Sequence, residues 1–234
     1  MIVIGSYKFG QMMEGATVLA HNANGISVVR MVDGRIAKLF RPTPLFSSAL
    51  IYPFSRRFVR AAHRLKQKHI QTVDVTAVYK VKSLNQHMVV YHPLEGMSLR
   101  QKLADETRCA KLLPPFARFL AKLHEKGVYF GGLHFGNVLV CSDALDKPEV
   151  SFGLIDIAST RFQATSLSPR QRARNFRLML NYDEDLRSLR LIGIDKFVAI
   201  YLHSARLSPI VKQAFMHHLS QRYDCLRNIG QSLA

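Results

Sequence analysis

The sequence predicts an α+β protein in which a small strand-rich lobe precedes a mainly helical lobe. Short strand-like runs separated by turn formers occupy the first part of the chain, and helical spacing dominates from about residue 97. No long linker or low-complexity stretch separates the two parts. With 234 residues, 48% of them hydrophobic, the chain can bury a sizeable core. We expect an N-terminal lobe at 1–96, ending in a hinge at 91–96, and a helical C-terminal lobe at 97–234.

The first expected elements form an antiparallel meander. Strand-like runs occur at Thr17–Ala20, Ser27–Met31 and Arg35–Phe40. Turn formers separate them, and the Asp33-Gly34 pair favours a tight hairpin between the second and third strands. A helix is expected next, over Pro53–Lys68, because its apolar residues recur at steps of three and four. Strand-like runs at Val73–Val81 and Met88–Tyr91 complete the lobe.

The C-terminal lobe is expected to begin with a short helix that Ser98 caps. A longer helix is predicted over Pro115–Lys126, where Gly127 ends it. The runs Val138–Cys141 and Val150–Ile155 indicate a short buried hairpin, and the chain from about 168 to 230 is helical and basic.

The net charge of +17 predicts an anionic partner. Between Arg41 and Thr72 the chain carries seven Lys/Arg residues and no carboxylate, and a second basic cluster follows near residue 170. The residues expected to face an anionic substrate or membrane are Arg56, Arg57, Arg60, Arg64, Arg170, Arg172, Arg174 and Arg177. Nucleic acid is a less favoured partner, because neither cluster contains interleaved aromatic residues or a known nucleic-acid-binding motif.

Neither a membrane span nor a signal peptide is predicted. No apolar run reaches the roughly 18 residues that a spanning helix needs, and polar residues interrupt the N-terminal segment. We therefore expect a cytoplasmic protein, with peripheral contact between its basic clusters and the inner face of the inner membrane.

Two segments indicate chemistry. The loop at 128–137 contains Leu133-His-Phe-Gly-Asn137, and Asp156 follows the apolar run Phe152–Ile155. Asn and Asp oxygens suit Mg²⁺, and the hairpin between the segments can bring the two side chains together at a buried strand end. Lys38 lies on the third expected strand, where a kinase places the lysine that contacts phosphates. Together these segments are typical of the catalytic loop and metal site of a kinase-like fold.

The segments Gly127–Val140 and Gly153–Asp156 resemble those of the lipopolysaccharide core kinases, the Kdo/heptose kinase family of the protein-kinase-like superfamily. Supporting matches are Arg35–Pro42, which is looser, Glu95–Leu99 and Arg172–Arg177. The resemblance covers about residues 15 to 205. It implies a two-lobed protein-kinase-like fold, with the metal-site strand end at 152–158.

The resemblance also implies roles for single residues. Lys38 would contact the ATP phosphates, and Asn137 and Asp156 would hold Mg²⁺. Asn24 and Gly25 would belong to the loop that covers the phosphates, and Tyr91 and Pro93 would border the adenine. The acceptor would be a hydroxyl of an anionic lipopolysaccharide core intermediate.

The sequence departs from the family pattern at two places. The loop aspartate that positions the acceptor hydroxyl is replaced by Gly132, and the absence of a positioned base typically costs a factor of about 10² to 10⁴ in rate. The helix after Lys38 also lacks the glutamate that pairs with the lysine in kinases. His134 is the loop side chain that could replace the base, although a structural packing role is favoured for it.

Two functions therefore stay open at this stage. The first is ATP-dependent phosphorylation of a core sugar hydroxyl. The second is that of a pseudokinase, which binds a nucleotide or partner and regulates or scaffolds core assembly without phosphotransfer. A basic nucleic-acid-binding module is a third, less favoured reading.

Overall fold

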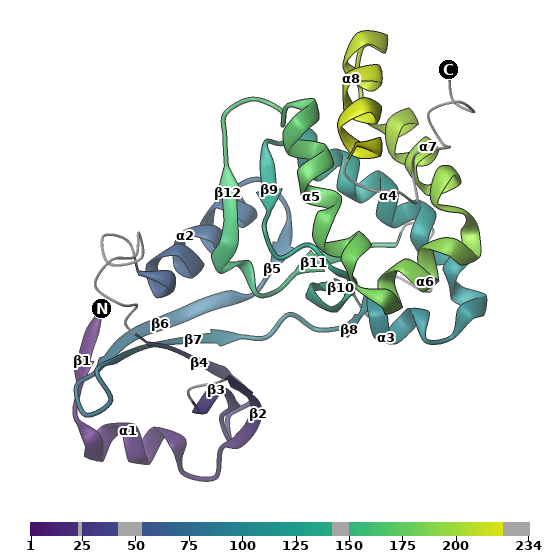
Figure 1. Cartoon of the computed structure of the whole chain (residues 1–234). Coiled ribbons are helices and arrows are strands. Elements are labelled where there is room, and N and C mark those ends of the chain that lie inside the picture. Colours follow the sequence, from purple (N-terminus) through teal and green to yellow (C-terminus); the bar gives the residue numbers. More distant parts are fainter. Residues whose placement is uncertain (23–24, 42–52, 142–149, 222–234) are drawn as a thin grey trace. The chain divides into compact units, whose positions relative to one another are not determined.

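The structure is a computed structural model, which describes residues 1–22, 25–41, 53–141 and 150–221. These residues form two compact units (Figure 1). The first unit comprises Met1–Leu94 and Asp156–Ser159, and the second comprises Glu95–Ile155 and the chain from Thr160 onward. The sequence placed the boundary two residues later, after 96, and did not indicate that Asp156–Ser159 returns to the first unit.

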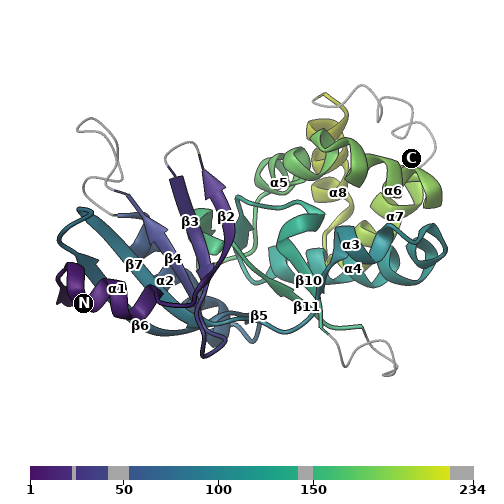
Figure 2. The ribbon, with the colours of Figure 1, turned by 90° about the horizontal axis from the view of Figure 1, so that it is seen from below.

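A six-stranded sheet forms most of the first unit, with the strand order β1-β6-β7-β4-β3-β2. β1 runs parallel to β6, and every other neighbouring pair is antiparallel. Figure 2 shows β7, β4, β3 and β2 in this order. The strands are β1 (Ile2–Ile4), β2 (Thr17–Asn22), β3 (Gly25–Arg30), β4 (Ile36–Phe40), β6 (Asp74–Val81) and β7 (Gln86–His92). The predicted meander is therefore confirmed. Gly34 adopts a φ of 83° in the turn between β3 and β4, a conformation that glycine adopts without strain.

Helix α1 (Ser6–Met13) was not predicted from the sequence. Its N-terminus has no side-chain cap, and a glycine interrupts its short apolar pattern. Phe9 and Met12 pack against the core cluster of the sheet, which includes Val81 and Met88. The helix therefore depends on tertiary packing more than on local sequence signals.

Helix α2 (Phe54–Gln67) confirms the helix predicted over Pro53–Lys68. Phe58, Ala61 and Leu65 are buried on one of its faces. The short strand β5 (Gln71–Thr72) follows it, and Lys66 of the helix forms an ion pair with Asp74 at the start of β6. The apolar spacing of this segment therefore identified the buried face correctly.

The second unit is mainly helical and contains two small groups of strands. β10 pairs antiparallel with β8 and β11, and β9 pairs antiparallel with β12. The strands are β8 (Met97–Ser98), β9 (Val128–Phe130), β10 (Val138–Val140), β11 (Phe152–Leu154) and β12 (Thr160–Phe162). The α-helices are α3 (Leu99–Leu103), α4 (Cys109–Glu125), α5 (Pro169–Asn181), α6 (Asp183–Ile192), α7 (Ile194–Ser204) and α8 (Pro209–Ser220). Short 3₁₀ helices are η1 (Glu106–Arg108) and η2 (Phe135–Asn137) here, and η4 (Ile157–Ser159) in the first unit.

Local signals located the start of α3 but not that of α4. Ser98 caps α3 in a capping box with Gln101, as its position predicted. The predicted start of the next helix at Pro115 is wrong, because α4 begins at Cys109 and contains two prolines in its interior. Cys109 and Leu112 are buried, so tertiary packing outweighs the unfavourable effect of proline within a helix.

Aromatic rings fill the core of the second unit around Phe116 of α4. The Phe116 ring centroid lies 5.5 Å from that of Phe135 and 5.6 Å from that of Phe152, both in edge-on contacts. Phe197 of α7 lies 6.1 Å away. The loop residue Phe135 is thereby anchored to the centre of this unit.

Candidate functional site

The first predicted site residue, Lys38, lies in the middle of β4, opposite Val89 of β7. Its Nζ atom is 2.5 Å from Oδ1 of Asp156, although 118 residues separate the two in sequence. The Lys38 side chain is 18% exposed and the Asp156 side chain 54%. The structure therefore brings together the lysine predicted to contact the phosphates and one of the two predicted metal ligands, and Asp156 is the partner that the carboxylate-free α2 does not provide.

The ion pair between Lys38 and Asp156 is weak enough for another anion to replace Asp156 beside the ammonium group. A pair with one half-exposed partner contributes about 0–1 kcal/mol, because water and salt screen its attraction. Rings surround the ammonium group on the inner side, with the centroids of Phe40 and Phe58 each 5.7 Å from Nζ. The rings fix the position of Lys38, while anionic oxygens that approach from solvent can compete for its charge.

The backbone of Asp156 has a φ of 51°, in the left-handed region. A non-glycine residue in this conformation costs of order 1–3 kcal/mol, although aspartate tolerates it better than most. The expectation of a buried carboxylate at the strand end is wrong, because β11 ends at Leu154 and the turn places Asp156 at an exposed position. Ile157, the next residue, is fully buried and anchors the turn.

Of the other residues predicted to contact the nucleotide, Tyr91 lies near the Lys38–Asp156 pair, because Tyr91 and Lys38 both contact the Phe58 ring. Tyr91 is buried at the end of β7, with its ring centroid 5.4 Å from that of Phe58. Burial, and secondarily the charge of Asp156, raises the pKa of the Tyr91 hydroxyl well above its usual value. Pro93 follows β7 and is half-buried, and Gly25 begins β3 with a φ of 106°. Asn24 lies outside the described residues.

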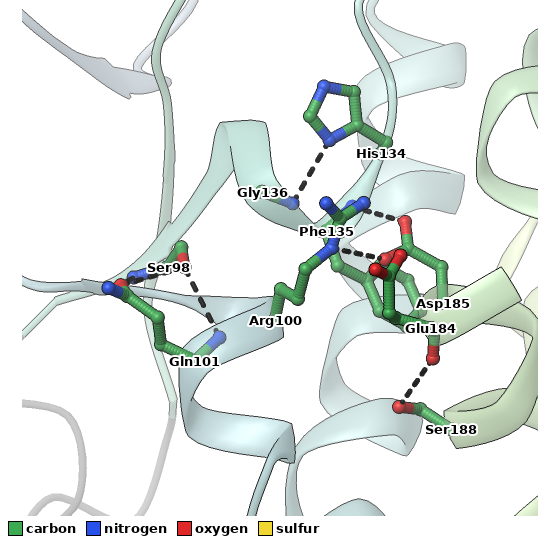
Figure 3. A network of polar contacts seen from close by, with 9 residues as sticks. All are labelled: Ser98, Arg100, Gln101, His134, Phe135, Gly136, Glu184, Asp185 and Ser188. Carbon is green, nitrogen blue, oxygen red and sulfur yellow. Dashed lines mark hydrogen bonds and ion pairs between the residues drawn. The ribbon is translucent and has the colours of Figure 1, made fainter. Parts of the chain in front are cut away.

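Backbone contacts hold the catalytic-like loop of the second unit at several points. Asn175 of α5 binds Phe130 twice, because its Oδ1 accepts from the Phe130 amide at 3.2 Å and its Nδ2 donates to the Phe130 carbonyl at 2.6 Å. Asp185 of α6 accepts the Phe135 amide at 2.7 Å and the Arg100 Nε–H at 2.8 Å (Figure 3). The loop is therefore fixed on both sides of Gly132.

Asn137 is oriented as a potential oxygen ligand. Its Nδ2 donates to the Gly132 carbonyl at 3.0 Å, which directs the amide. Within the described part of the chain, no group donates a hydrogen bond to its Oδ1. Its backbone carbonyl accepts the amide of Ile155, the residue before Asp156, at 3.0 Å. Asn137 belongs to the second unit, whereas Lys38 and Asp156 belong to the first.

The geometry of His134 argues against its use as a base. Its Nδ1 accepts the Gly136 amide at 3.1 Å, and its ring packs against that of Tyr182 in a tilted arrangement with the centroids 4.7 Å apart (Figure 3 shows the contact with Gly136). The Nδ1 lone pair is therefore engaged, and the proton of a neutral ring resides on Nε2. Both contacts favour the packing role over that of a proton acceptor.

A buried polar network behind the loop was not predicted. His124 of α4 contacts the Tyr201 hydroxyl through Nδ1 at 2.8 Å and Asn175 Oδ1 through Nε2 at 3.0 Å. Arg172 donates to the Tyr201 hydroxyl at 3.0 Å and to the Leu167 carbonyl at 2.8 Å. The signal in the sequence was the occurrence of polar residues at helix positions that face the core.

Arg172 corrects one part of the predicted basic surface. Its side chain is fully buried, so the expectation that it faces an anionic partner is wrong. Arg170, Arg174 and Arg177 on the same helix are exposed. Burial follows from helical spacing, because Ala173 and Phe176 continue the inward face on which Arg172 lies.

The basic face of α2 in the first unit is partly exposed. Arg56 and Arg60 are exposed, whereas Arg57 and Arg64 are half-buried. The Arg57 guanidinium lies 5.0 Å from the centroid of the Phe54 ring. Within the described ranges, no helix has both the length and the apolar character that crossing a bilayer requires.

The burial of His124 predicts acid sensitivity. Burial, together with the charge of Arg172, lowers the pKa of His124 from 6.5 to about 3. Between these values the unfolded chain binds a proton that the folded chain excludes, so stability is complete above about pH 6.5 and falls as the pH decreases toward 3. We expect the free energy of unfolding to fall by up to about 1.4 kcal/mol per pH unit in this window, from the histidine alone.

Denaturant titrations across this pH range can check the expected loss. His124→Gln retains hydrogen-bonding groups without a titrating ring, so its unfolding free energy should depend less on pH than that of the wild type. His217 is exposed, and His217→Gln is the matched control that should retain the wild-type slope. An unchanged slope in His124→Gln would contradict the assignment.

No cluster of three or more His, Cys, Asp or Glu side chains with metal-binding geometry occurs among the described residues. Mg²⁺ at nucleotide sites is commonly held by only one or two carboxylates together with phosphate oxygens and water. The available donors, the exposed Asp156 carboxylate and the oriented Asn137 amide oxygen, are of the hard oxygen type that this ion takes.

Comparison with known protein families identifies the family of this chain. Residues 15–201 match the lipopolysaccharide kinase (Kdo/WaaP) family. A similar solved structure is that of WaaP in complex with acyl carrier protein, with 17% identity and a TM-score of 0.46, covering 97% of this chain and 91% of that one. No curated protein matches the sequence. Because the family match includes Lys38, the loop and Asp156 and extends over most of the chain, the protein belongs to the lipopolysaccharide kinase (Kdo/WaaP) family, with a kinase-like role in lipopolysaccharide core biosynthesis.

Proposed function

We propose that this protein binds ATP and Mg²⁺ and transfers a phosphoryl group to a sugar hydroxyl of the lipopolysaccharide core. The observation that carries the proposal is the contact between Lys38 and Asp156, at 2.5 Å. A strand lysine and a carboxylate beyond a later strand are the two charges that a kinase-like site needs around its nucleotide phosphates. An isolated surface ion pair has no structural need for the strained backbone that presents Asp156.

The residues have separate roles in this proposal. Lys38 moves from Asp156 to the nucleotide phosphates, which frees the carboxylate for the metal ion. Asn137 contributes its amide oxygen, which the hydrogen bond to the Gly132 carbonyl orients in advance. Bound Mg²⁺ would neutralise phosphate charge, and bound ATP would supply the transferred group.

The loop contains no carboxylate to position the acceptor hydroxyl, and we assign no base to this reaction. Phosphoryl transfer has a loose transition state in most analyses, in which positioning and charge stabilisation contribute most of the catalysis. The reaction is therefore feasible without the base but slower, by a factor of about 10² to 10⁴.

The family and the charge of the protein support a proposal for the acceptor class and the location. Core intermediates of lipopolysaccharide are anionic, and the exposed arginines of α2 and α5 provide complementary charge. We propose that the protein acts at the cytoplasmic face of the inner membrane, with peripheral contact through these arginines.

A specific observation favours the alternative function, that of a pseudokinase. Gly132 lacks a functional side chain, and the nearby His134 is engaged by Gly136 and Tyr182. A protein of this kind would bind nucleotide through Lys38 and Asp156 and regulate or scaffold core assembly without transfer.

A transfer assay separates the two functions. Wild-type protein, [γ-³²P]ATP, Mg²⁺ and isolated core oligosaccharide should yield labelled saccharide, and Lys38→Met should lower the rate by about 10² or more, as expected for loss of a transition-state cation. Lys80 is an exposed lysine on β6 of the same sheet, and Lys80→Met should retain wild-type activity. Nucleotide binding with no labelled saccharide would establish the pseudokinase alternative.

A further inference from the structure

A pocket of about 360 Å³ lies in the second unit, where β9, β12 and the first turns of α5 meet (Figure 1 shows these elements). Its volume is within the range of about 300–1,000 Å³ that is typical of small-molecule sites. Of the basic residues that the sequence predicts to face an anionic partner, only Arg174 lines this pocket. The principal lining residues are Tyr129, Arg161, Phe162, Gln163, Gln171 and Arg174.

The charge of this pocket is wholly positive. Arg161 and Arg174 line it, and its lining contains no Asp or Glu. Both arginines are exposed, and neither forms an ion pair or hydrogen bond with any residue in the part of the chain that the structure describes. Two unpaired guanidinium groups beside a concave surface favour an anion with several oxygens, because each group presents a planar set of donors.

Internal contacts fix the walls of the pocket. Arg161 lies directly opposite Tyr129 in the register of β9 and β12. Gln171 Nε2 donates to Gln163 Oε1 at 3.0 Å, and the Gln163 amide donates to the Gly127 carbonyl at 2.9 Å. Gly127 has a φ of 69°, and a Cβ at this position would lie 2.5 Å from the Gln163 carbonyl oxygen. The close chain approach therefore requires glycine, and the pocket is formed in advance of any ligand.

The pocket lies close to the catalytic-like loop. Tyr129 precedes Gly132 by three residues, so their Cα atoms are at most about 10 Å apart, even for an extended chain. Asn175 holds the intervening Phe130 in place through two hydrogen bonds. A ligand in the pocket can therefore extend to the loop position where kinases orient the acceptor hydroxyl.

We propose that this pocket binds the phosphate group of a phosphorylated saccharide, with Arg161 and Arg174 as its cationic contacts. The aromatic side chains of Tyr129 and Phe162 provide surface for the C–H face of a sugar ring. The proposal rests on the proposed function only in naming this saccharide as the acceptor. Binding in the pocket itself requires neither nucleotide nor transfer.

Isothermal titration of the full chain at low ionic strength, with glucose 6-phosphate as the probe, tests this site. Arg161→Gln and Arg174→Gln should each weaken binding by about 10- to 100-fold, as expected for the loss of hydrogen bonds to a charged group. Arg177 is exposed on the same helix and does not line the pocket, so Arg177→Gln, with an identical change in net charge, should alter affinity less than about twofold. Glucose should bind much more weakly than its phosphate.

Three results would overturn the proposal: equal affinity in all three variants, no measurable binding of glucose 6-phosphate, or equal affinity for inorganic phosphate and the sugar phosphate. The last result would assign the pocket to a free anion.

Amide chemical shifts of Gly127 and Gln171 in wild-type protein provide a second measurement, independent of the folding of any variant. They should move during titration with glucose 6-phosphate, and ATP should not reproduce the movement. If glucose 6-phosphate does not bind, Mg²⁺-dependent ATP binding is still expected. If the protein does not transfer phosphate, glucose 6-phosphate is still expected to bind in this pocket.

Discussion

Gly132→Asp should accelerate phosphoryl transfer to core oligosaccharide by up to about 10² to 10⁴, the usual contribution of a positioned general base. The loop that receives the new carboxylate is already ordered, because Asn175 holds Phe130 and Asp185 holds Phe135. Gly132 does not have a positive φ, so an aspartate can adopt its backbone conformation. The variant therefore restores the missing group on an otherwise intact loop.

The measurement is the rate of label transfer from [γ-³²P]ATP under conditions that saturate the nucleotide. Gly131→Asp introduces the same charge one residue away and should leave the rate near that of the wild type. If Gly132→Asp is folded, binds ATP and yet transfers no faster, the loop does not hold the acceptor and the pseudokinase function is favoured.

Asp185→Ala should lower the free energy of unfolding by about 1.5–3 kcal/mol, the usual cost of losing hydrogen bonds to a charged group, because the remaining partner Arg100 is 31% exposed and can be solvated in part. Asp185 is fully buried and accepts from both the Phe135 amide and Arg100 Nε (Figure 3). Removal leaves a buried amide without an acceptor and the Arg100 charge without its counter-ion. The loop should consequently lose order between Gly132 and Asn137.

Thermal unfolding and amide hydrogen exchange can measure this effect. At roughly 2–4 °C per kcal/mol, the melting temperature should fall by about 3–12 °C. The adjacent Glu184 is exposed, and Glu184→Ala should change stability by no more than about 0.5 kcal/mol. Equal stability of the Asp185 and Glu184 variants would mean that Asp185 does not anchor the loop.

Features with local signals were predicted from the sequence. The period-two strands, the Asp33-Gly34 turn and the apolar face of α2 depend on residues close in the chain, and each is present in the structure. The short α1 was missed because packing against the sheet stabilises it. The start of α4 was misplaced because packing outweighs the effect of its two prolines.

The candidate site was predictable only where a motif marked its residues. Lys38 and Asp156 were named from the strand position and the apolar run, and their contact is present. The exposure of Asp156 and the burial of Arg172 depend on tertiary placement, for which charge and sequence position give no signal. The pocket around Arg161 combines short segments on three elements, so no single run of sequence indicated it.

The central claim is that Lys38 and Asp156 form a nucleotide and metal site. Its most direct test is the affinity of the full chain for ATP with and without Mg²⁺, measured by isothermal titration for wild type, Asp156→Asn and the exposed control Asp33→Asn. We predict that Mg²⁺ strengthens ATP binding by about tenfold or more in wild type and Asp33→Asn, and that Asp156→Asn loses this increment. An ATP affinity that is equal with and without Mg²⁺, or an unchanged Mg²⁺ effect in Asp156→Asn, would contradict the claim.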